Sequence, residues 1–172
     1  MTAKGYVQVY TGDGKGKTTA ALGLALRAAG AEYRVFIGQF MKKGEYSEIK
    51  ALKHLSAYVT IEQYGRTCFV STPSEEDIRA AREGLEEVRQ AVSSGEYRIV
   101  ILDELLVAVD FGLVPVEDVL QLISLRPPHV ELVLTGRNAH PAIMDAADLV
   151  TEMREVKHYF HKGVAARRGI ED

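Results

Sequence analysis

The sequence predicts an α/β domain with a mostly parallel central sheet, and three observations lead to this prediction. Segments with strand and helix patterns alternate along the 172 residues, as they do when helices connect parallel strands. The run Ile99–Leu102 is apolar without alternation, which is typical of a strand covered by helices on both faces. A glycine-rich loop joins the first strand pattern to the first helix pattern. Because the length is close to one average domain of ~150 residues, we expect a single domain, residues 1–172.

The first half of the chain carries three strand patterns, at residues 6–10, 34–40 and 59–64. An alanine-rich helix is expected at 19–29, and Gly30 ends it. Ser47 is expected to cap a short helix. Ser74 is expected to cap the clearest helix, which carries an apolar stripe at steps of three and four residues and ends at Gly95.

The second half repeats this alternation of strands and helices. Strands are expected at residues 98–103, 130–135 and 149–153. Short helices are expected at residues 105–111 and 116–124 and from Pro141 onward. The remaining residues, 156–172, are basic and show no regular pattern. The order of the strands in the sheet is not readable from the sequence.

The composition is that of a globular protein with a small negative charge. Hydrophobic residues make up 47% of the chain, and 21 Lys and Arg stand against 24 Asp and Glu, for a net charge of −3. This balance argues against nucleic acid or an anionic membrane as the main partner. The single cysteine, Cys68, cannot form an intramolecular disulfide, and no run approaches the ~18 apolar residues of a membrane span. We therefore expect a cytoplasmic protein.

The strongest functional signal is the loop at residues 12–19, Gly-Asp-Gly-Lys-Gly-Lys-Thr-Thr. Glycines let backbone N–H groups turn toward an anion, and the following helix adds the positive end of its dipole. Lys17 supplies a full charge, and Thr18 offers a hydroxyl to Mg²⁺. The alternative, a glycine-rich turn with an incidental lysine, is weakened by the flanking strand and helix. The predicted nucleotide-binding residues are Gly12, Asp13, Gly14, Lys15, Gly16, Lys17, Thr18 and Thr19.

Charged residues also follow two later strands. Asp103 and Glu104 end the apolar strand, where ligands bind in such sheets, and either could hold Mg²⁺ opposite Thr18. Arg137 follows the strand at 130–135, and its guanidinium suits phosphate oxygens. The ordinary alternatives are an acidic pair that marks a strand's exit to solvent and a solvated arginine after a turn. The residues together predict binding of a nucleoside triphosphate with Mg²⁺ or Mn²⁺, but they do not indicate which bond is broken.

Beyond this residue chemistry, the chain from Tyr6 to Glu171 resembles the P-loop type of ATP:corrinoid adenosyltransferase. The resemblance rests on the loop with its alanine-rich helix, on several short motifs and on a closing segment, residues 156–171. The short motifs are Gln39-Phe40, Leu102-Asp103-Glu104-Leu105, Leu134-Thr135-Gly136-Arg137 and Ala147-Asp148-Leu149-Val150-Thr151-Glu152-Met153. The closing segment is the most family-specific of these features.

The resemblance implies a three-layer P-loop NTPase fold of the RecA-like type and a homodimer. In the implied reaction, cobalt(I) of a corrinoid attacks C5′ of ATP and triphosphate leaves, in adenosylcobalamin biosynthesis or salvage. The ATP phosphates would lie reversed in the loop, residues 12–19. Lys17, Glu104 and Arg137 would be catalytic, and Thr18, Glu104 and Asp103 would lie at the metal. A flavoprotein reductase that donates electrons to cobalt is an expected partner.

The sequence departs from longer members of this family in two ways. It contains no Trp, whereas longer members carry an aromatic stretch that meets the corrin ring. Phe69 is the candidate for the corrin face here, with a core anchor as the alternative. The sequence begins at its first strand, so we expect it to lack the N-terminal extension that can cover the nucleotide.

Two other functions compete with adenosyl transfer. A conventional Mg²⁺-dependent ATPase or kinase would use Glu104 to polarise water or a hydroxyl. A non-catalytic ATP sensor would use nucleotide occupancy only to switch a partner surface. The closing segment, residues 156–171, favours the adenosyltransferase, because plain ATPases have no reason to share it.

Overall fold

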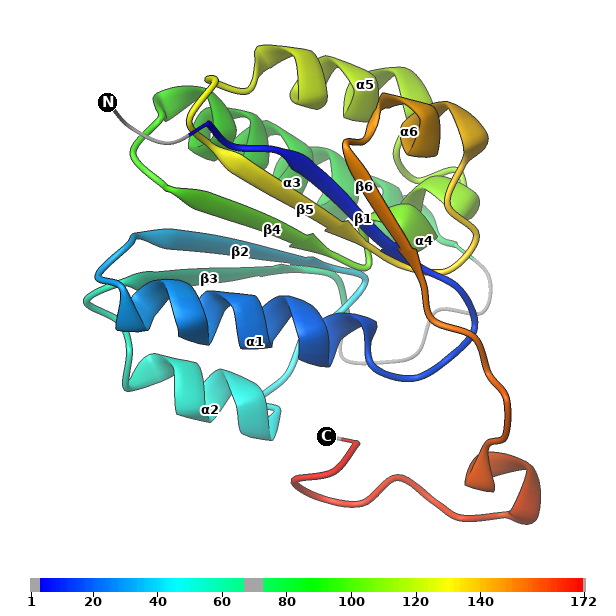
Figure 1. Ribbon diagram of the computed structural model, residues 1–172. Coiled ribbons are helices and arrows are strands. Elements are labelled where there is room, and N and C mark those ends of the chain that lie inside the picture. The colour runs from blue at the N-terminus through cyan, green and yellow to red at the C-terminus, as the bar shows by residue number, and fades with distance from the viewer. Residues whose placement is uncertain (1–3, 67–72, 172) are drawn as a thin grey trace.

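The computed structural model describes residues 4–66 and 73–171. These residues form one six-stranded sheet and the helices around it (Figure 1). All five pairs of neighbouring strands are parallel, in the order β3-β2-β4-β5-β1-β6. The predicted α/β class with a mostly parallel sheet is therefore confirmed. The strands are β1 (Val7–Thr11), β2 (Val35–Phe40), β3 (Val59–Tyr64), β4 (Ile99–Asp103), β5 (Glu131–Thr135) and β6 (Leu149–Glu152).

Helices cover both faces of the sheet and give three layers (Figure 1). One face is covered by α1 (Lys17–Gly30) and α2 (Ser47–Lys53). The helices of the other face are α3 (Glu75–Ser94), α4 (Leu105–Asp110), α5 (Val116–Leu125) and α6 (Pro141–Ala146). After β6 the chain leaves the sheet, and its only regular element is a 3₁₀ turn at Tyr159–Lys162 within residues 153–171. None of the helices in these described ranges is long and apolar enough to cross a membrane.

Strand β4 shows how the sequence builds the two cores. Val100 and Leu102 pack among the helices α3 to α5, whereas Ile99 and Ile101 pack under α1. Neighbouring residues of a strand point to opposite faces, so a strand between two helical layers is apolar at every position. The absence of alternation in this run was the correct signal for a strand buried on both faces.

The parallel arrangement brings four functional loops to one edge of the sheet. Gln39 of β2 lies opposite Asp103 of β4, and Tyr10 of β1 lies opposite Thr135 of β5. Because the strands run in one direction, the loops that follow β1, β2, β4 and β5 leave from the same edge. We call this the carboxyl edge, and ligands of open α/β sheets bind there.

The helix starts test the predicted caps. The Ser74 hydroxyl accepts a hydrogen bond from the Asp77 N–H, and the Asp77 carboxylate accepts one from the Ser74 N–H, which completes a capping box. Gly95 ends that helix in the left-handed conformation, as expected. The cap predicted for α2 was wrong, because Ser47 is already helical and Tyr46, with extended backbone, precedes it without a side-chain bond.

Candidate active site

The loop between β1 and α1 wraps around the side chain of Lys17. Gly12 and Gly16 have φ values of 95° and 123°, a region that favours glycine. Lys17 is the first residue of α1 and is 8% exposed. Its Nζ donates to the carbonyl oxygens of Gly12, at 2.5 Å, and Gly14, at 2.8 Å. The predicted strand–loop–helix context of a phosphate-binding loop is thus present, with its ammonium inside the loop.

The chain that follows β6 lies directly against this loop. The Gly14 N–H donates to the Met153 carbonyl at 2.7 Å, and the Met153 N–H donates to the Thr11 carbonyl at 2.8 Å. A Cβ on Gly14 would lie 2.7 Å from the Met153 oxygen and 2.8 Å from the Arg154 carbonyl carbon. Gly14 is therefore required for the close packing of these two segments. The sequence did not indicate this contact, because it joins residues far apart in the chain.

Asp103 is the centre of the polar network at the carboxyl edge. Its side chain has no exposed surface and accepts four hydrogen bonds, one from each of four segments. Oδ1 accepts from the hydroxyls of Thr18, at 2.8 Å, and Thr135, at 2.7 Å. Oδ2 accepts from Gln39 Nε2, at 3.1 Å, and from Lys42 Nζ, at 2.9 Å. A carboxylate has about four lone-pair sites, so these donors use its whole capacity.

Lys42, in the loop after β2, is a site residue that the sequence analysis missed. Its ammonium lies 2.9 Å from Asp103 and 3.9 Å from Glu104 Oε1, and 25% of its side chain is exposed. Burial lowers the pKa of Lys42, but the negative charges of Asp103 and Glu104 outweigh burial and raise it above its ordinary value. One signal could have found it: Lys42 follows the Gln39-Phe40 motif at a strand end.

Glu104 has a strained backbone at the junction of β4 and α4. Its φ of 57° places a non-glycine residue in the left-handed region, a conformation that often occurs at functional sites. Its N–H donates to Thr135 Oγ1 at 3.1 Å, which ties the junction to β5. The two adjacent carboxylates lie in different surroundings, since Asp103 is buried and Glu104 is partly exposed.

The charges at this edge influence one another. Burial and the charge of Asp103 raise the pKa of Glu104, while Lys42, Lys17 and Arg137 oppose this rise. Burial lowers the pKa of Lys17, Glu104 opposes this, and Arg137 lowers it further. Arg137 is exposed, yet it acts on both groups, so three cations and two carboxylates share one region.

The structure brings most predicted site residues together. The loop at 12–19, the acidic pair and Arg137 all lie at the carboxyl edge. Within the loop, Asp13, Lys15 and Thr19 are exposed, whereas Gly14 and Lys17 are buried. The predicted corrin-face residue, Phe69, and Cys68 lie outside the described residues.

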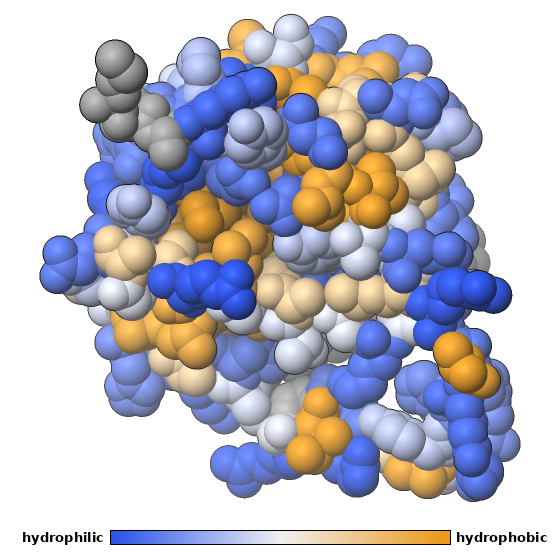
Figure 2. Space-filling model, in the orientation of Figure 1, coloured by the Kyte–Doolittle hydropathy of each residue, from blue (hydrophilic) through white to orange (hydrophobic). Residues whose placement is uncertain are grey.

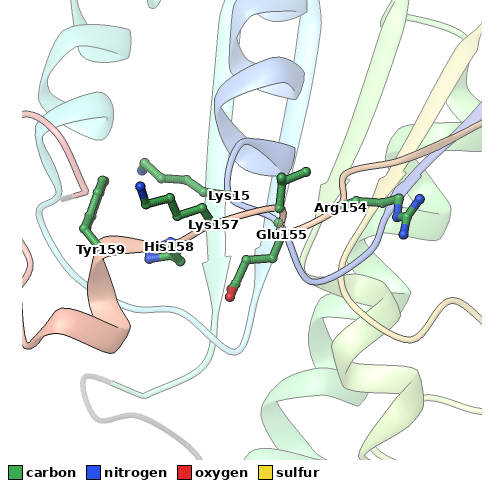
Figure 3. Close-up of a pocket in the computed structure, with 8 residues that line it drawn as sticks. Lys15, Arg154, Glu155, Lys157, His158 and Tyr159 are labelled. Atoms are coloured by element: carbon green, nitrogen blue, oxygen red, sulfur yellow. The ribbon is translucent and has the colours of Figure 1, made fainter.

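Beside the loop lies an open hollow of about 350 Å³. Figure 3 shows the side chains of Lys15, Lys157 and Tyr159 extending to one side of it and Arg154 to the other. Lys15 also donates to the Ile170 carbonyl at 3.1 Å, which ties the end of the closing segment to the loop. The hollow is lined by Gly14, Lys15, Arg154, Glu155, Val156, Lys157, His158 and Tyr159. Three of these side chains, Lys15, Arg154 and Lys157, are cationic and one, Glu155, is acidic, and this excess of positive charge suits an anionic ligand.

The polar groups at the carboxyl edge also fit a magnesium ion. The Thr18 hydroxyl donates a hydrogen bond to Asp103 and accepts one from Lys42 Nζ at 3.4 Å, which leaves one hydroxyl lone pair available to a cation. Proteins hold Mg²⁺ through one or two such oxygens and complete its shell with water and substrate phosphates. The described residues contain no group of three or more His, Cys, Asp or Glu that could hold a metal without such help.

Comparison with known proteins identifies the family. The family model of the ATP:corrinoid adenosyltransferases BtuR/CobO/CobP matches residues 3–171. The corrinoid adenosyltransferase of Escherichia coli K12 is 36% identical over 170 residues, which cover 98% of this chain and 86% of that protein. The corrinoid adenosyltransferase CobA of Salmonella typhimurium LT2 is likewise 36% identical over 170 residues, with the same coverage of 98% and 86%.

A fourth comparison involves a longer relative. The uncharacterized protein all2391 of Nostoc sp. PCC 7120 is 37% identical over 179 residues, and this chain spans about half of its length, 47%. The family model and the two enterobacterial relatives nevertheless cover nearly the whole of this chain. The chain belongs to the ATP:corrinoid adenosyltransferase family.

Proposed function

We propose that the carboxyl edge binds ATP with its C5′ carbon facing cobalt(I) of a corrinoid. The cobalt electron pair forms a Co–C bond to C5′, and the C5′–O bond breaks, so that its electron pair leaves with the triphosphate. Such a nucleophile needs no general base, and the protein's tasks are alignment and stabilisation of the leaving group. The observation that carries this proposal is the closed phosphate loop around Lys17, in a chain of the adenosyltransferase family.

The residues would divide these tasks between them. The loop N–H groups of residues 12–19 would hold the triphosphate, and Lys17 would turn from the loop carbonyls to its oxygens. Arg137, exposed beside Lys17, would contact the developing negative charge. Asp103 would act by holding Thr18 in place, since its own oxygens are already fully bonded.

Magnesium would be held by Thr18 and Glu104, with Asp103 behind Thr18. When bound, Mg²⁺ would supply positive charge to the leaving triphosphate. The strained Glu104 backbone supports this assignment, because it directs a partly exposed carboxylate to the same edge as Thr18. A role for Glu104 as a base is not required by the proposed reaction.

The partners of the reaction are proposed from the family likeness. Cobalt(I) requires a strong electron donor, and a flavoprotein reductase would supply it. Phe69 is kept as the proposed contact to the corrin face. A homodimer is also proposed, since β6 is an edge strand whose Leu149 and Val150 are 45% and 44% exposed. Figure 2 shows apolar side chains gathered over the side of the sheet that β6 forms.

The products distinguish adenosyl transfer from its competitors. The protein is incubated anaerobically with ATP, Mg²⁺ and a corrinoid reduced to cobalt(I), and the phosphates are resolved by ³¹P NMR. We expect a light-sensitive cobalt–carbon product together with triphosphate and little ADP. The corrinoid is omitted in the control, which should leave ATP intact.

Two other outcomes would contradict the proposal. ADP release that ignores the corrinoid would identify a conventional ATPase. ATP binding without any product, under continuously monitored cobalt(I), would identify a sensor.

A further inference from the structure

The ammonium of Lys42 lies among the same groups that are proposed to hold the metal. Its Nζ is 2.9 Å from Asp103 Oδ2, 3.9 Å from Glu104 Oε1 and 3.4 Å from Thr18 Oγ1. Asp103 has no exposed surface and the Lys42 side chain is 25% exposed, so the pair is partly shielded from water. Lys42 is therefore the nearest neutralising charge for both carboxylates, since the Lys17 ammonium is bonded to its own loop.

The backbone of the loop after β2 holds Lys42 at the position from which its ammonium contacts Asp103. Met41, just before it, has a φ of 56°, which is strained for a residue with a side chain, and its N–H donates to the Tyr64 carbonyl at 2.8 Å. A Cβ on Gly65 would lie 2.6 Å from the backbone nitrogen of Lys42, so only glycine lets the loops after β2 and β3 approach this closely. The position of Lys42 is thus fixed by two neighbouring strands.

A chain of side-chain amides holds the other end of the same loop. The Gly44 N–H donates to Gln63 Oε1 at 3.0 Å, and Gln63 Nε2 donates to Gln39 Oε1 at 2.9 Å. Gln39 then donates to Asp103 at 3.1 Å. The loop that carries Lys42 is therefore connected to Asp103 both through the ammonium and through two glutamines. These connections indicate that the position of the Lys42 ammonium beside Asp103 has a role.

We propose that Lys42 is a positioning residue that neutralises Asp103 and Glu104 until metal and nucleotide bind together. An ammonium at this position repels a free divalent cation, and it satisfies the carboxylates that would otherwise attract one. The triphosphate brings enough negative charge to balance the ammonium and the metal at once. Lys42 would therefore make the site accept Mg²⁺ with ATP but not alone. This inference rests on the proposed function, because it takes Thr18 and Glu104 as the metal ligands.

Binding of Mn²⁺ to the nucleotide-free protein tests this proposal. Free Mn²⁺ is followed by its EPR signal during titration with wild type, Lys42→Met and Lys42→Gln. We expect both variants to bind one Mn²⁺ at least about tenfold more tightly than wild type, because a nearby like charge is removed. Lys42→Arg keeps the charge and should stay close to wild type. Lys43→Met is the matched control, since Lys43 is an exposed neighbour of the same type and should not change the affinity.

Several results would overturn the proposal. Folded Lys42→Met or Lys42→Gln with wild-type Mn²⁺ affinity would do so, as would equal tightening by Lys43→Met. Wild-type protein that binds one Mn²⁺ as tightly without ATP as with ATP would also overturn it, without any variant. The titration uses no corrinoid and no turnover, so its result is separate from whether triphosphate or ADP is the product.

Discussion

Asp103 is a fully buried carboxylate, and its four donors explain how burial is tolerated. A buried charge is costly unless it is paired and hydrogen-bonded, and removing one partner leaves the other groups unsatisfied. The donors come from α1, β2, the β2 loop and β5, so one side chain joins four segments at the carboxyl edge. Asp103 would thus act on the proposed nucleotide site through the residues it positions.

Replacing Lys17 by alanine should weaken ATP binding by more than tenfold. The ammonium would form charge-assisted hydrogen bonds to the triphosphate, which are worth about 1.5–3 kcal/mol. Isothermal titration with ATP and Mg²⁺ measures the change, and circular dichroism confirms the fold. Lys53→Ala is the control, because Lys53 pairs with Glu45 on the exposed side of α2. Unchanged affinity in folded Lys17→Ala would remove the phosphate-loop assignment.

Replacing Glu104 by glutamine should lower activity in a way that extra metal partly restores. Glutamine keeps the shape of the side chain but removes the charge that would hold Mg²⁺. Initial rates are measured over a range of Mg²⁺ and Mn²⁺ concentrations for both proteins. If the variant stays inactive at every concentration while its metal affinity is normal, Glu104 acts as a base and the metal assignment is wrong.

At the level of elements, the segment after β6 and the loop at residues 12–19 pack as one unit. Replacing Gly14 by alanine should displace this segment, because the added Cβ would lie 2.7–2.9 Å from Met153 and Arg154 backbone atoms. We expect a loss of stability of about 1–3 kcal/mol, as for other overpacked sites, measured by urea unfolding.

Gly23→Ala is the matched control for this substitution. Gly23 lies within α1, and nothing is within 4 Å of its added Cβ. Alanine should therefore stabilise the helix by about 0.5–1 kcal/mol. Opposite signs at the two glycines are expected, and equal stabilisation at Gly14 would show that the close contact is not maintained.

A partly buried ion pair ties the start of α3 to the residues that follow β3. Arg66 donates to both carboxylate oxygens of Asp77, at 2.7 and 2.6 Å, and Ser74 bonds the same group. The Arg66 guanidinium, with Ser74, lowers the pKa of Asp77 to about 2, from an ordinary value of 3.8. A depressed pKa contributes stability above the unfolded value, and this stability is lost as the pH falls from 3.8 toward 2.

Asp77→Asn should therefore lose stability in a pH-dependent way. At pH 7 we expect a loss of about 1.5–3 kcal/mol, the typical worth of hydrogen bonds to a charged group. The difference from wild type should shrink below about pH 4, where wild-type Asp77 begins to lose its advantage. Urea unfolding at a series of pH values measures this, with the exposed Glu76→Gln as the control. A difference that is constant with pH would contradict the role of the charge.

The sequence predicted the elements well because each depends on local pattern. The unbroken apolar run of β4 and the Ser74 cap were read correctly from neighbouring residues. Three features depend on distant contacts and were not predicted: the strand order, the packing of Met153 on the loop, and Lys42 beside Asp103. Ser47 failed as a cap because a serine near a helix start need not occupy the capping position.

At the scale of the whole molecule, the candidate site lies where the connections that leave neighbouring strands run in opposite directions across the sheet. Strand β1 sits between β5 and β6, and β4 sits between β2 and β5, so the chain passes the centre of the sheet repeatedly. The phosphate loop, the acidic pair, Lys42 and Arg137 come from four separate parts of the sequence. A ligand that joins them would link both halves of the sheet. Nucleotide binding should therefore stabilise the entire fold. The same measurement tests the prediction that residues 1–172 form a single domain.

ATP with Mg²⁺ should raise the midpoint of thermal unfolding by an amount that grows with the logarithm of the ATP concentration divided by its Kd. A ligand that binds only the folded state at 100 times its Kd adds about 2.7 kcal/mol. For a domain of this size each kcal/mol shifts the midpoint by about 2–4 °C, so we expect a rise of about 5–11 °C. Inorganic triphosphate with Mg²⁺ should also raise it, because the proposed product occupies the same loop, whereas adenosine alone should do little. Lys17→Ala should lose most of the shift with both ligands. A wild-type midpoint that does not move at saturating ATP would mean that the nucleotide does not bind at the carboxyl edge.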